Sequence, residues 1–302
     1  MGRAHGVISA VVCTADRQAK LKRLLASLSA VELRRGLSAE LILVNNAPLN
    51  DLGSILREAA IHLQMPVTLV NESSPGLARA RNRGLLHARG AVIAFTDDDC
   101  IVDRSWLANI WGRFVSEPEL MGLGGRVELA RPGDVPVTVR TGDVPEQLST
   151  FAGVFGFMHG CNMAFRRALF ERIGGFDSDF GAGSALRAGE DTEFVYRAFR
   201  AGARIGYEPS VLVWHDHGRA TWRQKRTTLN GYHQANGAVL AKFARAGDAP
   251  ATALLRAVAR RPLDLLRRRP FSVLEATRAW YQLLMFGLGA ARYRVLARHV
   301  PE

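Results

Sequence analysis

Cysteine is scarce in this chain of 302 residues, and the few cysteines present form no pattern. Cys13, Cys100 and Cys161 are odd in number and widely spaced along the sequence. This gives neither a disulfide framework nor the spacing of a cysteine metal site. The usage is typical of a reducing compartment in which the thiols stay free or buried.

Long hydrophobic runs are also missing. The most apolar segment lies between Arg278 and Arg292, where only 13 uncharged residues occur in a row, fewer than the ~20 that a membrane-spanning helix needs. Near the N-terminus, the apolar segment 6–14 is followed at once by Asp16 and Arg17, so it indicates a strand and not a secretory signal. We therefore expect a cytoplasmic protein, with a peripheral position on the inner face of the membrane as the alternative.

Acidic residues are scarce in the last part of the chain. Residues 1–218 contain 24 Lys and Arg and 24 Asp and Glu, whereas residues 219–302 contain 16 Lys and Arg and only 4 Asp and Glu. The formal charge of +12 is therefore confined to the second segment, where leucines and arginines occupy different faces of predicted helices. We expect a neutral domain over residues 1–218 and a basic, amphipathic helical extension over residues 219–302.

The partner of this extension stays open at this point. An anionic membrane surface suits a basic amphipathic segment. Nucleic acid is disfavoured, because leucine-rich sequence separates Arg260-Arg261 from the run 267–269. The third reading is that the helices pack on the rest of the chain and leave a solvated basic face.

The segment Ala91–Thr96 has the sequence of a buried strand and leads directly into Asp97, Asp98 and Asp99. A core cannot hold three unpaired carboxylates, so they should lie past the C-terminal end of the strand, where open α/β sheets bind ligands. If the chain stays extended, Asp97 and Asp99 point the same way, and their oxygens suit Mg²⁺ or Mn²⁺. A solvated acidic turn is the alternative.

Hydrophobic periodicity predicts strands and helices in alternation. Strands are expected at 7–13, 40–44, 67–70 and 90–95, with helices between them at 17–28, 52–63 and 77–88. Beyond residue 100, helices are expected at 106–114, 168–173 and 191–201, strands at 120–129 and 204–214, and loops at 131–150 and 181–189. The alternation predicts an α/β fold with a doubly wound, mostly parallel sheet.

Several motifs spread over residues 7–217 together resemble the inverting family 2 glycosyltransferases with the GT-A fold. They are Cys13–Arg17, Val44–Asn46, Pro75–Asn82, Phe95–Asp99, Gly160–Arg166, Ile173–Asp177, Gly189–Asp191 and His215–His217. Each motif is weak alone, but their order and spacing make the resemblance specific.

The resemblance implies a metal-dependent transferase. Asp97 and Asp99 match the Asp-any-Asp motif that holds Mg²⁺ or Mn²⁺ against the diphosphate of the donor. His215 matches a histidine that ligates the metal in some members, and His217 competes for that role.

Catalysis is implied in the segment Gly189–Asp191. Asp191 matches the general base that takes the proton of the acceptor hydroxyl, and Glu190 beside it is the second catalytic candidate. Taken without the resemblance, Asp191 could equally cap the helix that follows it.

The donor site is implied by a further set of matches: Thr14, Asp16, Arg17, Asn45, Arg81, Asp97 and Asp98. Two positions depart from the family pattern, because Ala15 replaces a residue that often contacts the base and Asn45 replaces a usual aspartate. Asparagine still donates and accepts hydrogen bonds, so we expect a nucleotide, with uridine as the default base. For Arg81, the alternative is a solvated helix charge like its neighbours Arg79 and Arg83.

The acceptor is expected near Gly160, Cys161 and Asn162, where glycine permits a close approach to the backbone; a tight loop is the alternative. Trp214 is the candidate for stacking on a sugar ring, although an aromatic side chain is more often part of a core. We expect a nucleotide-sugar donor and a saccharide or lipid-linked acceptor, as in polysaccharide biosynthesis. The two alternatives are a metal-dependent phosphoesterase and a non-catalytic nucleotide-binding module recruited to a membrane.

Overall fold

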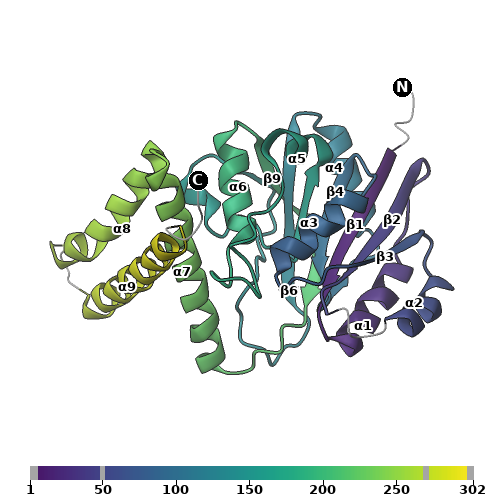
Figure 1. Cartoon of the computed structure of the whole chain (residues 1–302), viewed down its shortest axis with the longest axis horizontal. Helices are drawn as coiled ribbons and strands as arrows, with labels where there is room; N and C mark the ends of the chain where they lie inside the picture. Colours follow the sequence, from purple (N-terminus) through teal and green to yellow (C-terminus); the bar gives the residue numbers. More distant parts are fainter. Residues whose placement is uncertain (1–5, 48–51, 268–271, 298–302) are drawn as a thin grey trace.

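The computed structural model describes residues 6–47, 52–267 and 272–297. Within these residues nine strands form one sheet with helices on both of its faces (Figure 1). The strand order is β3-β2-β1-β4-β8-β6-β9-β5, with β7 paired to β9. The strands are β1 (Gly6–Thr14), β2 (Leu37–Asn45), β3 (Val67–Asn71), β4 (Val92–Asp97), β5 (Cys100–Val102), β6 (Leu120–Leu129), β7 (Glu146–Gln147), β8 (Asn162–Arg166) and β9 (Arg204–His215). The helices are α1 (Gln18–Ser29), α2 (Gly53–Ala60), α3 (Leu77–His87), α4 (Trp106–Ser116), α5 (Arg167–Ile173), α6 (Glu190–Arg200), α7 (Trp222–Arg245), α8 (Ala249–Arg267) and α9 (Val273–Leu296).

Helices cover both faces of the sheet, because side chains alternate along its buried strands. In β1, Val11 and Cys13 belong to the core that contains α3, α5 and α6. Ala10 and Val12 belong to a second core that contains α1, α2 and α4. The predicted doubly wound architecture is confirmed by this arrangement.

The parallel part of the sheet brings the ends of its strands to one edge. In β1, Thr14 lies opposite Asn45 of β2, and Cys13 lies opposite Asp97 of β4. The predicted donor and metal residues of these strands therefore share one edge of the sheet, where ligands of open α/β folds bind.

The rest of the sheet is mixed. The strand β8 runs antiparallel to both β4 and β6, whereas β9 runs parallel to β6. Between β6 and β8 the chain contains only β7 and a short 3-10 turn, and a parallel return would need a crossover connection such as a helix. The segment 131–150, predicted as a loop, has little regular structure, and the segment 204–215 forms a single strand.

The helical extension is joined to the α/β body. Lys242 of α7 binds both Glu193 and Asp177 at 2.6 Å, and Tyr196 of α6 donates a hydrogen bond of 2.7 Å to Asp248 before α8. The core on the α6 side continues into α7, α8 and α9, so the domain division at residue 218 stays a prediction. Among the described residues no helix is long and apolar enough to cross a membrane, and the three cysteines are buried and free.

Candidate active site

The chain turns at the three consecutive carboxylates, so that Asp97 contacts Arg81, whereas Asp98 and Asp99 share Arg17. Asp97 is the last residue of β4, whereas Asp98 and Asp99 form the turn into β5. The chain therefore does not stay extended through them, and the alternation that would align Asp97 with Asp99 does not apply.

Asp98 is buried and connects two predicted donor residues. It accepts a hydrogen bond of 2.7 Å from the Thr14 hydroxyl and one of 3.2 Å from the Arg17 guanidinium. Burial raises the pKa of Asp98 to about 6, against the opposing effects of the Thr14 hydrogen bond and the Arg17 charge. These contacts fix the turn to the end of β1.

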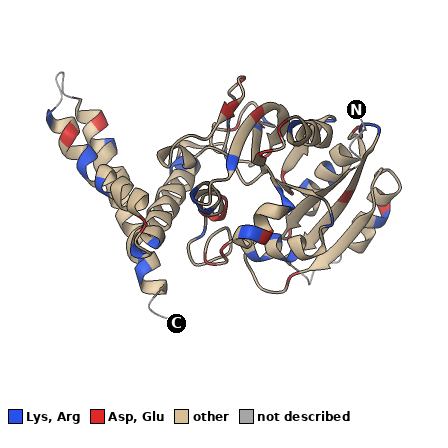
Figure 2. Cartoon of the chain, turned by 90° about the horizontal axis from the view of Figure 1, so that it is seen from above, with Lys and Arg blue, Asp and Glu red and all other residues tan. Residues whose placement is uncertain are grey.

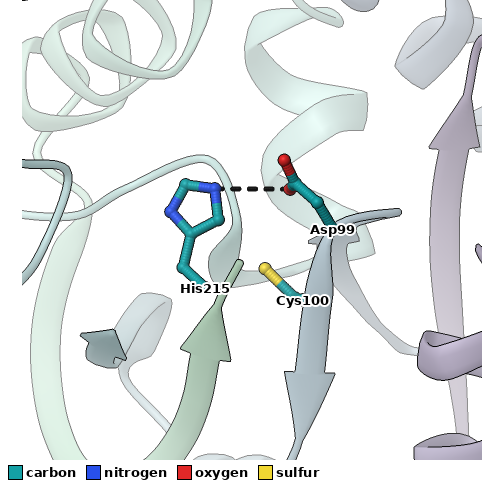
Figure 3. Close-up of side chains that lie close together, drawn as sticks. All are labelled: Asp99, Cys100 and His215. Atoms are coloured by element: carbon teal, nitrogen blue, oxygen red, sulfur yellow. Dashed lines mark ion pairs between the residues drawn. The ribbon is translucent and has the colours of Figure 1, made fainter. Parts of the chain in front are cut away.

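Asp99 lies beside His215, the histidine at the end of β9, with 3.3 Å between Oδ1 and Nε2 (Figure 3). Arg17 donates to Asp99 at 2.8 Å, and the Lys20 ammonium lies 3.7 Å away. Burial disfavours the ionised carboxylate, but the His215 hydrogen bond and the nearby positive charges outweigh it and lower the pKa of Asp99 to about 2. Burial also opposes the charged imidazole, yet Asp99 raises the pKa of His215 to about 9.

A cation could be held where Asp99, Cys100 and His215 converge. Their ligand atoms lie within 4.8 Å of one another (Figure 3), and the buried Nδ1 of His215 has no hydrogen-bond partner within the described structure. Carboxylate oxygen and imidazole nitrogen suit Mn²⁺, whereas a thiol is a soft ligand that suits neither Mg²⁺ nor Mn²⁺. Asp99 and His215 therefore fit the metal implied by the family motif, and Cys100 does not.

The other two predicted metal candidates lie elsewhere. Asp97 is outside this group and faces Arg81. The Nδ1 atom of His217 accepts a hydrogen bond from the Arg219 amide and lies 3.4 Å from Asp134. Of the two histidines, only His215 thus contacts Asp99 in the described ion pairs.

Arg81 joins three segments of the candidate site. Its guanidinium donates to Glu190 at 2.6 Å, to Asp97 at 3.1 Å and to the Gly160 carbonyl at 3.0 Å. The side chain is 2% exposed, whereas Arg79 and Arg83 on the same helix are exposed. The solvated reading is therefore wrong for Arg81.

Glu190 is buried at the start of α6. Burial, together with the neighbouring Asp191 charge, raises the pKa of Glu190 to about 7, although Arg81 favours the ionised form. Its oxygen is committed to the buried pair with Arg81, so Glu190 does not face solvent.

Asp191 is half-buried in the first turn of α6. Its carboxylate accepts hydrogen bonds from the Gly160 amide at 2.9 Å and from the Thr192 amide at 2.6 Å. The N-cap residue of α6 is Gly189, which has a left-handed conformation with φ of 88°. Asp191 is therefore not the N-cap residue, although its carboxylate does bind the Thr192 amide in the first helical turn.

Of the four predicted acceptor residues, only Gly160 contacts Asp191 and Arg81. Gly160 contacts both Asp191 and Arg81 through its backbone, and a Cβ atom at this position would meet the Arg81 guanidinium at 2.8 Å. Cys161 is buried, and Trp214 is half-buried within β9. Only glycine therefore fits position 160 without displacing Arg81.

Asn162 supports the sheet. Its amide group donates to the carbonyls of Arg126 and Val211 at 2.8 Å each, and its oxygen accepts from the Trp106 indole at 3.0 Å. Because the side chain is fully buried, its predicted role at the acceptor is not supported.

The remaining donor candidates lie at the edge of the sheet. Asn45 is buried at the end of β2 and accepts from the Ala47 amide at 3.1 Å, and Asp16 has a positive φ of 56° in the loop after β1. The adjacent Asn46 binds the carbonyls of Glu72 and Ser74 and so holds the loop before α3.

Sequence reasoning missed two residues beside Asp99. Cys100 reaches His215 because the two residues pair between the antiparallel strands β5 and β9, a contact that no local pattern reveals. Lys20 could have been found, because it lies three residues after Arg17 and so one helical turn further along α1.

Comparison with known proteins identifies the family. Residues 9–174 match glycosyl transferase family 2. The pre-mycofactocin glycosyltransferase of Mycobacterium tuberculosis is 28% identical over 224 residues, which cover 72% of this chain and 44% of that protein. The chain therefore spans less than half the length of this relative.

Solved structures show the same fold at low sequence identity. The mannosyltransferase PcManGT from Pyrobaculum calidifontis, in complex with GDP-Man and Mn²⁺, has a TM-score of 0.62 and 20% identity over 98% of this chain and 89% of that one. TarS of S. aureus in complex with UDP-GlcNAc has a TM-score of 0.58 and 15% identity over 97% and 76% of the two chains. The fold is thus of the GT-A type, and with a family match over more than half of its length the chain belongs to glycosyl transferase family 2.

Proposed function

We propose that this chain transfers a sugar from a nucleotide-sugar donor to a hydroxyl group of a saccharide or lipid-linked acceptor, with inversion at the anomeric carbon. The observation that carries the proposal is the connection of Asp191 to the carboxylate edge of the sheet. Gly160 binds Asp191 through its amide and Arg81 through its carbonyl, and Arg81 also binds Asp97. A half-buried carboxylate thus lies next to the edge at which family 2 motifs imply the donor.

In this proposal Asp191 acts as the general base. It takes the proton of the acceptor hydroxyl while the hydroxyl oxygen forms a bond to the anomeric carbon. The bond from that carbon to the diphosphate oxygen breaks in the same step, and its electron pair leaves with the nucleoside diphosphate. The amides of Gly160 and Thr192 hold the carboxylate in place.

Glu190 has a positioning role in the proposal. Its side chain is buried and paired with Arg81, so it orients the start of α6 without touching the acceptor. This differs from the direct catalytic role that the sequence suggested.

The donor diphosphate would lie at Asp99 and His215, with Arg17 and Lys20 beside it. A divalent cation held by the carboxylate and the imidazole would bind the diphosphate and reduce the negative charge that develops on the leaving group. Two similar structures, with GDP-Man and Mn²⁺ and with UDP-GlcNAc, support a nucleotide-sugar. We retain UDP as the first candidate for the nucleotide of the donor and GDP as the second.

The proposed location is the inner face of a membrane, where a lipid-linked acceptor would be found. The support is the concentration of positive charge in residues 219–302, which would favour an anionic surface.

Calorimetric titration of UDP and GDP, with and without Mn²⁺, tests the donor site. We expect one diphosphate to bind only when Mn²⁺ is present. If a folded protein binds neither diphosphate in either condition, the proposed donor class is wrong. If one diphosphate binds equally without the ion, the metal-dependent part of the proposal fails.

A further inference from the structure

The helix α9 has two faces with different surroundings. Its buried face packs on α7, where Gly289 lies against the Gln234 carbonyl and Gly237 lies against the Phe286 carbonyl. The Gln234 amide also contacts the Met285 sulfur at 3.7 Å. This side of α9 therefore already has its partner within the chain.

The opposite face of α9 is a continuous apolar surface. At 100° per residue, five exposed large side chains align along one side of the helix. We call these residues the α9 stripe: Val273, Trp280, Leu284, Leu288 and Val295, exposed by 69%, 48%, 56%, 47% and 56%. The stripe is about 33 Å long, because 22 residues separate its ends at 1.5 Å each.

The stripe lacks free polar groups. Two hydroxyl groups lie on or beside it, and both have partners: Thr277 donates within the helix to the Val273 carbonyl at 2.8 Å, and Tyr281 accepts from the Asn230 side chain at 2.7 Å. Of the 16 exposed large hydrophobic residues among those described, seven belong to α9. A concentration of this kind marks an interaction surface and not the scattered exposure of an ordinary monomer.

The charge around the stripe is positive. Arg292 and Arg294 project on either side of it, as their helical angles require, and both are exposed. Within the described parts of α8 and α9 the arginines are Arg256, Arg260, Arg261, Arg267, Arg278, Arg292 and Arg294, against the acids Asp264 and Glu275. Figure 2 shows these two helices standing away from the α/β body, with more basic than acidic residues along them.

We propose that the α9 stripe docks this chain on an anionic phospholipid surface, with α9 lying in the plane of the membrane. The apolar side chains enter the boundary between headgroups and acyl chains, and the flanking arginines bind lipid phosphates. Charge decides between occupants, because a second copy of the same basic helix would repel this one, whereas an anionic bilayer attracts it. The inference rests on the proposed membrane location and is independent of the transfer chemistry.

The test measures binding of the full chain to vesicles by co-sedimentation. Vesicles of phosphatidylcholine with phosphatidylglycerol are compared with vesicles of phosphatidylcholine alone. The stripe variant carries Trp280→Ser, Leu284→Ser and Leu288→Ser. The matched control carries Ile61→Ser, Leu86→Ser and Val144→Ser, which remove exposed side chains of the body (79%, 76% and 63% exposed).

We expect the wild type and the control to bind the anionic vesicles, and the stripe variant to bind them at least about tenfold more weakly. Quenching of Trp280 fluorescence by brominated lipid should disappear in Trp280→Phe. The proposal is overturned if the wild type does not bind, or if the stripe variant binds as well as the control does. A second copy of the chain would be the occupant instead if the wild type does not bind vesicles and light scattering shows that the wild type is a dimer and the stripe variant a monomer. That result also overturns the proposal.

Nucleotide titration separates this inference from the proposed function. The stripe variant should bind the diphosphate with Mn²⁺ as the wild type does, because its changes lie outside the carboxylate edge. If the wild type binds vesicles but no nucleotide, docking stands and the transfer function fails.

Discussion

Arg81 and Glu190 form a buried ion pair, 2.6 Å long, between the middle of α3 and the first residue of α6. The same guanidinium binds Asp97 at the end of β4 and the carbonyl of Gly160. One side chain thus holds together the helix that carries Asp191, the strand that carries the carboxylates and the loop between them. The three segments of the candidate site are therefore connected through the Arg81 side chain.

Replacing Arg81 should therefore affect stability as well as activity. Arg81→Gln leaves Glu190 buried without its cation, and at a pH above about 7, where Glu190 is ionised in the wild type, the free energy of unfolding should fall by about 3 kcal/mol. Arg83→Gln is the matched control, because Arg83 is exposed on the same helix and its loss should change stability by less than about 0.5 kcal/mol. Urea unfolding followed by circular dichroism measures both, and equal stabilities would contradict the bridging role.

Glu190 should make stability depend on pH. Its pKa is raised from 4.5 to about 7 in the folded state, so the folded protein holds a proton there that the unfolded chain releases. The stabilisation from this proton is complete below about pH 4.5 and is lost as the pH rises through about 7. The free energy of unfolding should fall by up to about 3 kcal/mol over this range. We expect this loss in the wild type and not in Glu190→Gln.

The measurement compares the two proteins by urea unfolding at several pH values between 5 and 8. Subtracting one curve from the other removes the titration of groups that the two proteins share. A difference that stays constant with pH would rule out the raised pKa.

Local patterns in the sequence predicted much of this fold and part of the site. Alternating hydrophobic segments predicted the parallel strands and their helices, and the position of Asp97 at a strand end followed from the cost of burying carboxylates. The sequence left open whether the chain stays extended or turns at Asp98 and Asp99, because the spacing is the same in both cases. The pairing of Cys100 with His215 depends on strands far apart in the sequence, which periodicity does not reveal.

Local sequence patterns also do not predict that Arg81 is buried. It lies between two exposed arginines with the same spacing, and only the approach of α6 and Gly160 distinguishes it from them. The structural contacts of Asn162, which do not support its suggested acceptor role, were hidden for a related reason, since its three hydrogen-bond partners come from distant segments.

Asp191→Asn should reduce turnover without changing donor binding. The amide keeps the size of the carboxylate but cannot take a proton, so we expect a loss of about 10²- to 10⁴-fold. Turnover is measured with the donor found by titration and a panel of hydroxyl acceptors. Thr192→Ala is the control, because it keeps the backbone amide that binds Asp191 and removes only the hydroxyl contact at 3.3 Å. A fully active Asp191→Asn enzyme would exclude Asp191 as the base.

The metal proposal distinguishes Cys100 from its two neighbours. Asp99→Asn and His215→Gln should each weaken Mn²⁺ binding at least about tenfold, whereas Cys100→Ser should change it by less than about threefold. Titration followed by electron paramagnetic resonance measures binding without any substrate, because the signal of free Mn²⁺ decreases as the ion binds. If Cys100→Ser abolishes binding and His215→Gln does not, the site selects a softer ion.

The crossing of α7 and α9 should tolerate no side chain at position 289. A methyl group there would collide with the Gln234 carbonyl, which is backbone and cannot turn away, so Gly289→Ala should cost about 1–3 kcal/mol. Gly287→Ala, two residues earlier, meets no atom within 4 Å and should stabilise the helix by up to about 1 kcal/mol. Limited trypsin digestion at the exposed arginines of α8 and α9 compares the two variants, with faster cleavage expected only for Gly289→Ala.

The effect of this crossing should reach the candidate site. Gly189, the cap of α6, lies so close to Ala235 of α7 that an added Cβ would be 2.8 Å from the alanine methyl carbon. A displacement of α7 by Gly289→Ala would therefore press on the residue two positions before Asp191. We expect turnover to fall in Gly289→Ala and to stay unchanged in Gly287→Ala. Normal turnover in a Gly289→Ala protein with rapid digestion of α9 would show that the extension moves independently of α6.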